Sequence, residues 1–169
     1  MIFVTVGTHE QLFNRLIEKV DDLKKRGVIT EEVFMQTGFS DYVPRYCKWK
    51  KFISIKEMNA YMEKANIIIC HGGPATFLKA IRLSKIPIVV PRQSKYHEHV
   101  NNHQLDFVKY IYSYNKNIIP VYDVNELGNI INNFSGITKK LNNSGLQDNN
   151  KLFNMKLNEV VSNLFKKEK

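Results

Sequence analysis

A strand-to-helix turn in the middle of the chain constrains the fold most. The apolar run 66–69 has the β-branched residues and the length of a buried strand, whereas 78–83 contains good helix formers. The Gly-Gly pair at 72–73 breaks the strand, and Pro74 suits a first helical turn, where its missing N–H costs nothing. A helix that begins there offers unpaired amide groups at the positive end of its dipole. We therefore expect this turn to hold the diphosphate of a nucleotide, with Thr76 as an additional hydroxyl donor.

The same residues also allow a ligand-free turn, because Gly-Gly followed by Pro is common turn chemistry. The chain contains neither the G-x-G-x-x-G dinucleotide fingerprint nor a Gly-Lys-Ser/Thr phosphate loop. The surrounding pattern has to decide between the two interpretations.

Strands and helices are expected to alternate along the chain. Strands are expected at 2–6, 32–36, around 52–53, 66–69, 86–91 and 118–121, and helices at 13–26, 58–65, 74–83, 101–110 and 124–134. This alternation predicts an α/β fold, a Rossmann-like parallel sheet with helices on both faces. Ligands bind such sheets beyond the carboxyl ends of the strands. The loops 7–9, 71–76 and 92–102 all follow strands, which favours the phosphate interpretation.

The end of the chain differs in composition. Residues 135–150 are rich in Asn, Ser, Gly and Lys, which predicts a polar linker. Residues 151–169 are predicted to form an amphipathic helix. Its apolar stripe consists of Phe153, Leu157, Val160, Val161 and Leu164. Such a helix can dock on its own domain, on a partner or at a membrane surface.

Composition narrows the function classes. The 169 residues fit one domain, and no stretch approaches the ~20 apolar residues that span a bilayer. Residues 1–7 resemble a first strand and not a signal peptide, and Cys47 and Cys70 lack motif spacing, so we expect a cytoplasmic protein with reduced thiols. The net charge of +9 suits a polyanionic partner. Because no nucleic-acid-binding motif accompanies it, we expect an acidic membrane face and no nucleic acid.

A histidine-rich segment follows the 86–91 strand. His99 and His103 are four residues apart and can share a helix face, but Asn101 stands where the H-E-x-x-H pattern needs its second histidine. No third ligand has a fixed spacing, so we expect no bound metal. Glu98, His99 and Asn102 instead supply donors and acceptors suited to sugar hydroxyls.

Three segments together resemble the C-terminal domain of family 28 glycosyltransferases. They are His71-Gly72-Gly73-Pro74-Ala75-Thr76-Phe77, Ile86-Pro87-Ile88-Val89-Val90-Pro91-Arg92 and Glu98-His99-Val100-Asn101-Asn102-His103-Gln104. Within that family the chain is most similar to the small β-1,4-galactosyltransferase subunits of bacterial capsule and exopolysaccharide clusters. The opening residues 4–9 resemble that group too, as well as the eukaryotic subunit that adds the second N-acetylglucosamine to dolichol-linked sugar.

The resemblance implies half of an enzyme. Residues 1–134 would form the UDP-sugar donor domain, like the C-terminal half of a GT-B glycosyltransferase. A separate membrane-anchored subunit would bind the lipid-linked oligosaccharide acceptor and hold this chain at the inner face of the cell membrane. The implied reaction is an inverting transfer, with galactose as the sugar, from UDP-sugar to a lipid-diphosphate-linked acceptor, without a metal or other cofactor. A UDP-N-acetylglucosamine transferase subunit and a non-catalytic enhancer of the same complex remain alternatives, and the length argues against a nucleotide-sugar epimerase.

The family pattern also implies site residues. It assigns donor binding to Thr8, His71, Gly72, Gly73, Ala75, Thr76, Arg92, Glu98, His99 and Asn102. His9 is a candidate catalytic base, and a base from the partner subunit is the alternative. Many relatives bind the ribose through a glutamate eight residues after the motif histidine, but here that position is Lys79, which can contact a phosphate or face solvent.

Overall fold

The alternating pattern folds into one parallel sheet. The computed structural model describes residues 1–143. The strands are β1 (Ile2–Thr5), β2 (Val33–Gln36), β3 (Lys48–Lys50), β4 (Ile67–His71), β5 (Ile88–Val90) and β6 (Ile119–Pro120). The helices are α1 (Asn14–Lys25), α2 (Ile55–Lys64), α3 (Pro74–Arg82), α4 (His103–Asn115), α5 (Leu127–Asn132) and α6 (Phe134–Asn143), with the 3-10 turns η1 (Ser94–Tyr96) and η2 (Val124–Glu126).

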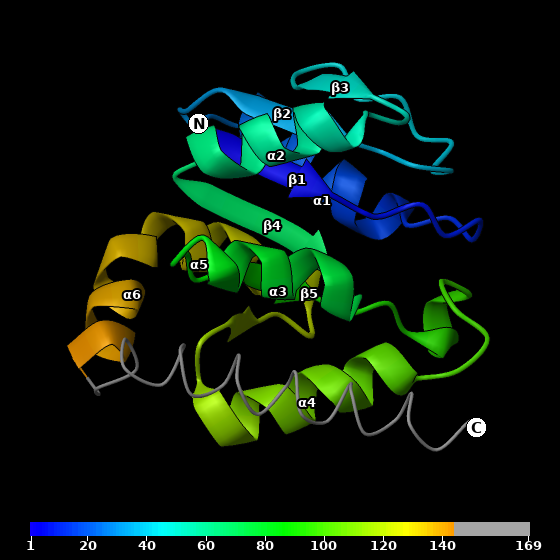
Figure 1. The fold of residues 1–169 in the computed structure, drawn as a ribbon. Coiled ribbons are helices and arrows are strands. Elements are labelled where there is room, and N and C mark those ends of the chain that lie inside the picture. Colours follow the sequence, from blue (N-terminus) through cyan, green and yellow to red (C-terminus); the bar gives the residue numbers. More distant parts are fainter. Residues whose placement is uncertain (144–169) are drawn as a thin grey trace.

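The strand order is β3-β2-β1-β4-β5-β6, and every neighbouring pair is parallel. The order reverses at β1, where Ile2 aligns with Val33 on one side and with Ile67 on the other. All strands therefore end on one edge, which lies on the right in Figure 1. A reversal of this kind opens a crevice between the loops at the carboxyl ends of the two central strands. The predicted α/β fold class is confirmed.

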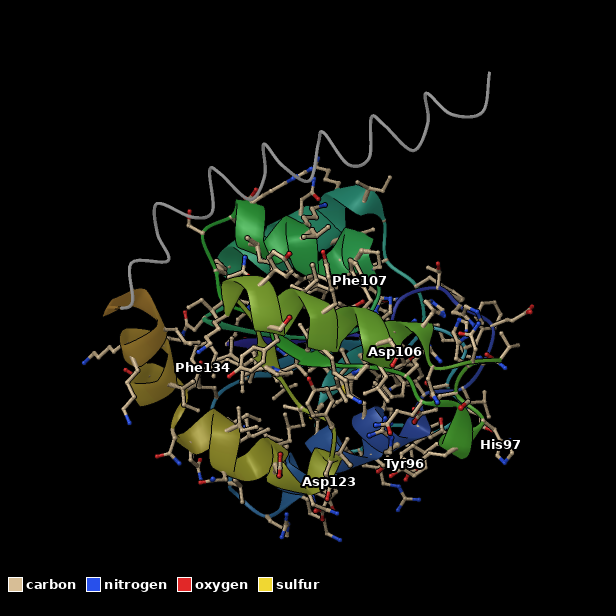
Figure 2. All side chains as sticks on the ribbon, turned by 90° about the horizontal axis from the view of Figure 1, so that it is seen from below. Tyr96, His97, Asp106, Phe107, Asp123 and Phe134 are labelled. Atoms are coloured by element: carbon tan, nitrogen blue, oxygen red, sulfur yellow. The ribbon has the colours of Figure 1, made fainter. Side chains whose placement is uncertain are left out.

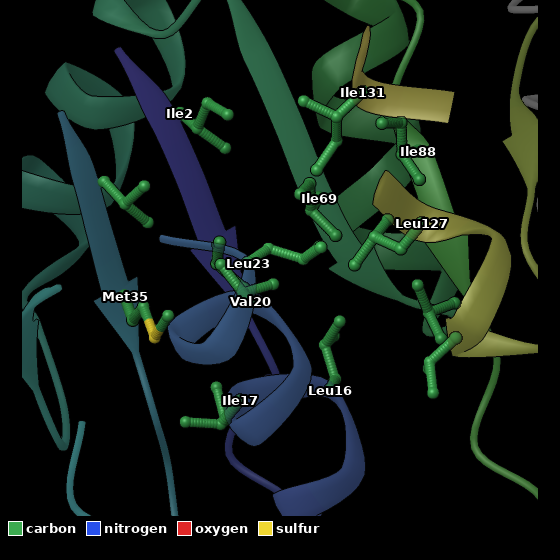
Figure 3. Packing of buried hydrophobic residues seen from close by; sticks show 14 of the residues in the cluster. Ile2, Leu16, Ile17, Val20, Leu23, Met35, Ile69, Ile88, Leu127 and Ile131 are labelled. Carbon is green, nitrogen blue, oxygen red and sulfur yellow. The ribbon is translucent and has the colours of Figure 1, made fainter. Parts of the chain in front are cut away.

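Helices cover both faces of the sheet because alternate strand residues point to opposite sides. Ile2 and Val4 of β1 belong to a cluster with Leu16 and Val20 of α1 and with Leu127 of α5. Figure 3 shows this packing of α1 and α5 against the strands. The intervening residues face α2, α3 and α4, which lie in front of the sheet in Figure 1.

Helix α3, which follows β4, begins at a specific local sequence signal. Gly73 is the N-cap of α3 in an extended conformation, and Pro74 occupies its first turn. Proline is favoured there because its fixed φ is already helical. By contrast, α2 begins with a capping box, in which Ser54 and Glu57 exchange hydrogen bonds. No side chain caps α3 in this way. Pro74 has no N–H and the N–H of Thr76 donates to the Gly73 carbonyl at 3.2 Å, so in the first turn it is the N–H of Ala75 that a ligand can accept from.

Two predicted elements differ from the structure. The strand expected around 52–53 lies at Lys48–Lys50, an edge strand on which Trp49 packs inward between two exposed lysines. The linker expected at 135–150 is wrong for residues 135–143, which belong to α6. Phe134, Ile137 and Leu141 recur at helical spacing and pack against the core, so the polar composition describes only the outer face of this helix.

Phe134 lies at the end of the molecule opposite η1 with Tyr96 and His97 (Figure 2). The remaining linker residues and the helix predicted at 151–169 lie outside the described residues. Within residues 1–143, no helix is both long and apolar enough to cross a bilayer.

Candidate functional site

The site forms where the loops after β1 and β4 meet. His71 ends β4, and its ring lies between two glycines, Gly7 from the first loop and Gly73 at the N-cap of α3. Gly7 has a φ of +75°, and a Cβ there would come within 2.6 Å of the His71 ring. A Cβ on Gly73 would overlap Nε2 of the same ring. Both glycines are therefore needed for the close approach of the two loops around the imidazole.

His71 is uncharged at neutral pH in this position. Burial, and then the charge of Arg92, lowers the pKa of His71 to about 4. Its buried Nδ1 atom forms no hydrogen bond of ordinary geometry within residues 1–143, although the nearby backbone of Thr5 partly offsets the lowering of the pKa. A neutral imidazole offers one donor and one acceptor. It can therefore hydrogen-bond a ligand at the start of α3, while the backbone amides of that helix supply the attraction for an anion.

The residues predicted to hold phosphates lie around this turn. Ala75 is exposed in the first turn of α3, and the partly buried Thr76 follows it. The exposed Thr8 belongs to the loop after β1, the strand that pairs with β4. Gly72 is buried, and a Cβ there would meet Cβ of Gln104 at 3.1 Å. The fold thus places the predicted phosphate-binding residues at one edge of the sheet, and their role in binding stays a prediction.

A cluster of three histidines joins the first loop to the loop after β5. The rings of His9 and His99 are 4.7 Å apart between centroids, and those of His99 and His103 are 4.2 Å apart. Burial, followed by the charges of His103 and His9, lowers the pKa of His99. His9 and His99 were predicted separately, as a base and as a sugar ligand, and the structure brings them together. Within residues 1–143, no three His, Cys, Asp or Glu side chains are arranged to hold a metal ion.

Glu98 and Arg92 form buried contacts within the protein, and their predicted donor binding stays a prediction. Glu98 is 3% exposed and accepts two hydrogen bonds of 2.8 Å from Arg15 of α1, through Nε and Nη2. It also accepts a bond of 3.0 Å from the backbone N–H of Gln93. Its carboxylate is therefore occupied within the protein. Glu98 fastens the loop after β5 to α1.

Arg92 likewise joins two loops through its hydrogen bonds. It is 1% exposed, and its guanidinium donates to the carbonyl groups of Val6, Gln11, Leu12 and Glu98. Burial lowers the pKa of Arg92 to about 10, so the side chain still carries its charge at neutral pH. The structure therefore gives Arg92 a role in positioning the first loop against the loop after β5, and its contact with the donor stays a prediction.

Asn102 lies at the N-cap of α4 and is exposed. Its side-chain oxygen accepts hydrogen bonds from the N–H and the hydroxyl of Ser94, at 2.9 and 3.0 Å. Lys79 points toward α2, where its ammonium group donates to Asn59. The structure thus gives Lys79 a contact that was not predicted, a hydrogen bond that joins α3 to α2.

The sequence interpretation missed several residues that hold the site together. Gln36 donates to the Gly7 carbonyl at 2.9 Å and hydrogen-bonds Thr5, while Gln104 accepts from the backbone N–H of Arg92 at 3.2 Å. Gln104 lies within the quoted histidine segment and could have been selected from it. Arg15 and Gln36 could not, because each contacts residues that only the folded sheet brings near.

Comparison with known proteins places the chain in a family. The model of the glycosyltransferase family 28 C-terminal domain matches residues 1–117. No curated protein matches the chain. The crystal structure of the glycosyltransferase SnogD from Streptomyces nogalater matches 71% of this chain and 30% of its own, with 21% identity and a TM-score of 0.50. The chain thus spans less than a third of that enzyme's length, and the likeness shows a shared fold.

Proposed function

Since this chain belongs to the glycosyltransferase family 28 C-terminal domain family, we propose that it is the donor-binding, catalytic subunit of an inverting glycosyltransferase. It would transfer galactose from UDP-galactose to a lipid-diphosphate-linked acceptor in the synthesis of capsular or exopolysaccharide. The observation that carries the proposal is the turn from β4 into α3, where the Gly73 N-cap lacks a side-chain cap beside the reversal in strand order. That is where an α/β sheet binds a nucleotide.

The proposed chemistry uses this turn for the leaving group. The acceptor hydroxyl oxygen forms a bond to C1 of the sugar, and the bond between C1 and the diphosphate oxygen breaks with its electron pair on UDP. The amides at the start of α3 and the neutral His71 would stabilise the charge that grows on the diphosphate. The proton of the acceptor hydroxyl passes to a base. His9 is our candidate, because it lies on the loop after β1 beside His99.

A second subunit would complete the cleft. We propose that a membrane-anchored partner binds the lipid-linked acceptor and brings its hydroxyl to the donor. This is consistent with the share of the matched glycosyltransferase that the chain spans, 30%. Positioning of two reactants can supply ~7–11 kcal/mol of a barrier. Without the partner, the donor domain should therefore turn over a lipid-linked acceptor very slowly.

Calorimetric binding of UDP tests the proposal at the turn. We expect wild type and Gly136→Ala to bind UDP alike, since a Cβ on Gly136 would meet nothing within 4 Å. Gly73→Val should abolish binding, because its side chain would displace His71 and cover the start of α3. Thr76→Ala, which adds no bulk, should weaken binding and guards against misfolding of the valine variant.

A panel of UDP-sugars then tests the sugar. The wild-type chain should prefer UDP-galactose to UDP-N-acetylglucosamine in binding. Unchanged UDP affinity in a folded Gly73→Val variant would remove the proposed site, whereas a preference for the N-acetyl sugar would change only the substrate.

A further inference from the structure

Exposed apolar side chains gather on the loops that follow β1, β2 and β3. Phe39 and Phe52 are 48% and 47% exposed, and their rings meet edge to face with centroids 5.2 Å apart. Ile55, at the start of α2, is 80% exposed, and Leu12 is 43% exposed. We call the pair of rings, with Ile55 and Leu12 on the neighbouring segments, the Phe39–Phe52 surface. Apolar side chains that gather in this way on a protein surface commonly mark an interaction site.

Hydrogen bonds donated by backbone amides hold the loops of this surface together. The N–H of Gly38 donates to the Lys51 carbonyl at 2.8 Å, next to both phenylalanines. The N–H of Phe13 donates to the Ser40 hydroxyl at 3.2 Å, which ties the residue after Leu12 to the residue after Phe39. The surface is therefore a feature of the folded edge. It lies on the same edge of the sheet as the turn from β4 into α3.

The charges at this surface favour an anionic partner. Lys51 and Lys56 are exposed on either side of Phe52 and Ile55, and neither forms an ion pair within the described part of the chain. The neighbouring Lys50 differs, because Glu57 pairs with it at 2.7 Å. Two exposed acids also lie on these loops, Asp41, which accepts a hydrogen bond from Asn14, and Glu10 on the loop of Leu12. Two unpaired cations thus flank the apolar side chains, on a chain whose net charge is +9.

We propose that the Phe39–Phe52 surface binds directly to an anionic lipid bilayer, with both rings in the interfacial layer and Lys51 and Lys56 at the headgroups. Exposed phenylalanine side chains insert into the boundary between headgroups and acyl chains, and lysines near an anionic leaflet are attracted to it. The binding would bring the loops after β2 and β3 to the membrane. It requires neither a nucleotide nor the proposed glycosyl transfer.

Co-sedimentation of the full-length chain with vesicles tests this inference. Vesicles of phosphatidylglycerol and phosphatidylcholine in equal parts should bind the wild type, and vesicles of phosphatidylcholine alone should bind it far less. Phe39→Ser/Phe52→Ser should lower the affinity for the anionic vesicles by at least about tenfold, since two half-exposed rings lose their transfer from water. Lys51→Gln/Lys56→Gln should lower it by about fivefold for each lysine at low salt.

Two matched control variants test whether any exposed aromatic pair, or any exposed pair of lysines, would have the same effect on vesicle binding. Tyr110 and Tyr114 form another exposed aromatic pair, on α4, with centroids 5.1 Å apart. Tyr110→Ser/Tyr114→Ser should bind vesicles like the wild type, and so should Lys139→Gln/Lys140→Gln on α6. Circular dichroism of each variant verifies folding.

Three results would overturn the inference. They are no binding of the wild type to anionic vesicles, full binding of a folded Phe39→Ser/Phe52→Ser variant, or an equal loss in the tyrosine variant. Full binding of the phenylalanine variant would place the membrane contact on another part of the chain. UDP affinity, measured without vesicles, reports on the proposed function separately, so the two hypotheses can fail independently.

Discussion

Replacing Glu98 by glutamine would preserve the shape of a buried side chain and remove the charge that holds Arg15. The side chains of Arg15 and Glu98 are only 14% and 4% exposed, so water cannot replace the lost partner. The guanidinium would keep its position over the Tyr96 ring, 4.5 Å from the centroid, without a carboxylate. The perturbation therefore leaves a buried cation unpaired at the junction of α1 and the loop after β5.

The structure sets the size of the effect. Arg15 donates two hydrogen bonds of 2.8 Å to Glu98, and bonds to charged groups contribute roughly 1.5–3 kcal/mol each. Glutamine keeps one acceptor oxygen, while removal of one partner from a buried ion pair typically costs about 3–5 kcal/mol. We therefore expect Glu98→Gln to lower the free energy of unfolding by about 3 kcal/mol. That loss is smaller than the typical stability of about 5–15 kcal/mol, so the variant should still fold.

Urea unfolding with linear extrapolation measures this loss. The matched control is Glu32→Gln, because Glu32 pairs with Lys48 at 2.7 Å on the surface, with both side chains well exposed. Solvent and salt screen such a pair, so this variant should be as stable as the wild type within error. The double variant Arg15→Met/Glu98→Leu should lose less free energy of unfolding than the sum of the losses in Arg15→Met and in Glu98→Leu, since it leaves no unpaired charge. It should not recover fully, because the N–H of Gln93 loses its acceptor.

Equal stability of Glu98→Gln and Glu32→Gln would refute the reasoning. So would strict additivity of the Arg15 and Glu98 changes, since that result would mean that the two side chains do not interact in the folded protein.

Three further predictions concern the site. Burial lowers the pKa of His71 to about 4 in the folded protein, whereas a histidine in the unfolded chain has a pKa of about 6.5. The unfolded state therefore binds a proton more readily, and the full stability is present only at a pH above about 6.5. The free energy of unfolding should fall as the pH drops through this window, and His71→Gln should show a smaller fall. Galactosyl transfer should persist in excess EDTA, since the proposed leaving group is held by backbone amides; loss of turnover restored by one divalent ion would contradict this. The purified chain alone should turn over a lipid-linked acceptor at a small fraction of the rate seen with a membrane-bound acceptor subunit, and a high rate without a second protein would reject the divided enzyme.

Local patterns were sufficient for the elements that a short stretch of chain specifies. The β-branched run before Gly72, the glycines and Pro74 predicted β4, the turn and α3, because each property is written in neighbouring residues. Composition alone failed at α6, where Phe134, Ile137 and Leu141 carry the helical period among polar residues. The period of the apolar residues was more informative there than the average polarity of the segment.

The sequence by itself determined the fold class and the edge on which the site lies, since β-α alternation requires a parallel sheet whose loops share one edge. Only the tertiary structure decided which side chains meet there. The order that places β1 beside β4 brings His71 between Gly7 and Gly73, and it allows Arg15 to reach Glu98, 83 residues away in the chain. These contacts join segments that carry no mutual signal, because periodicity records which face of an element is buried but not which element covers it. For that reason the sequence could not show that Glu98 and Arg92 hold the loops of the site in place, whereas their role as ligands of the donor stays a prediction.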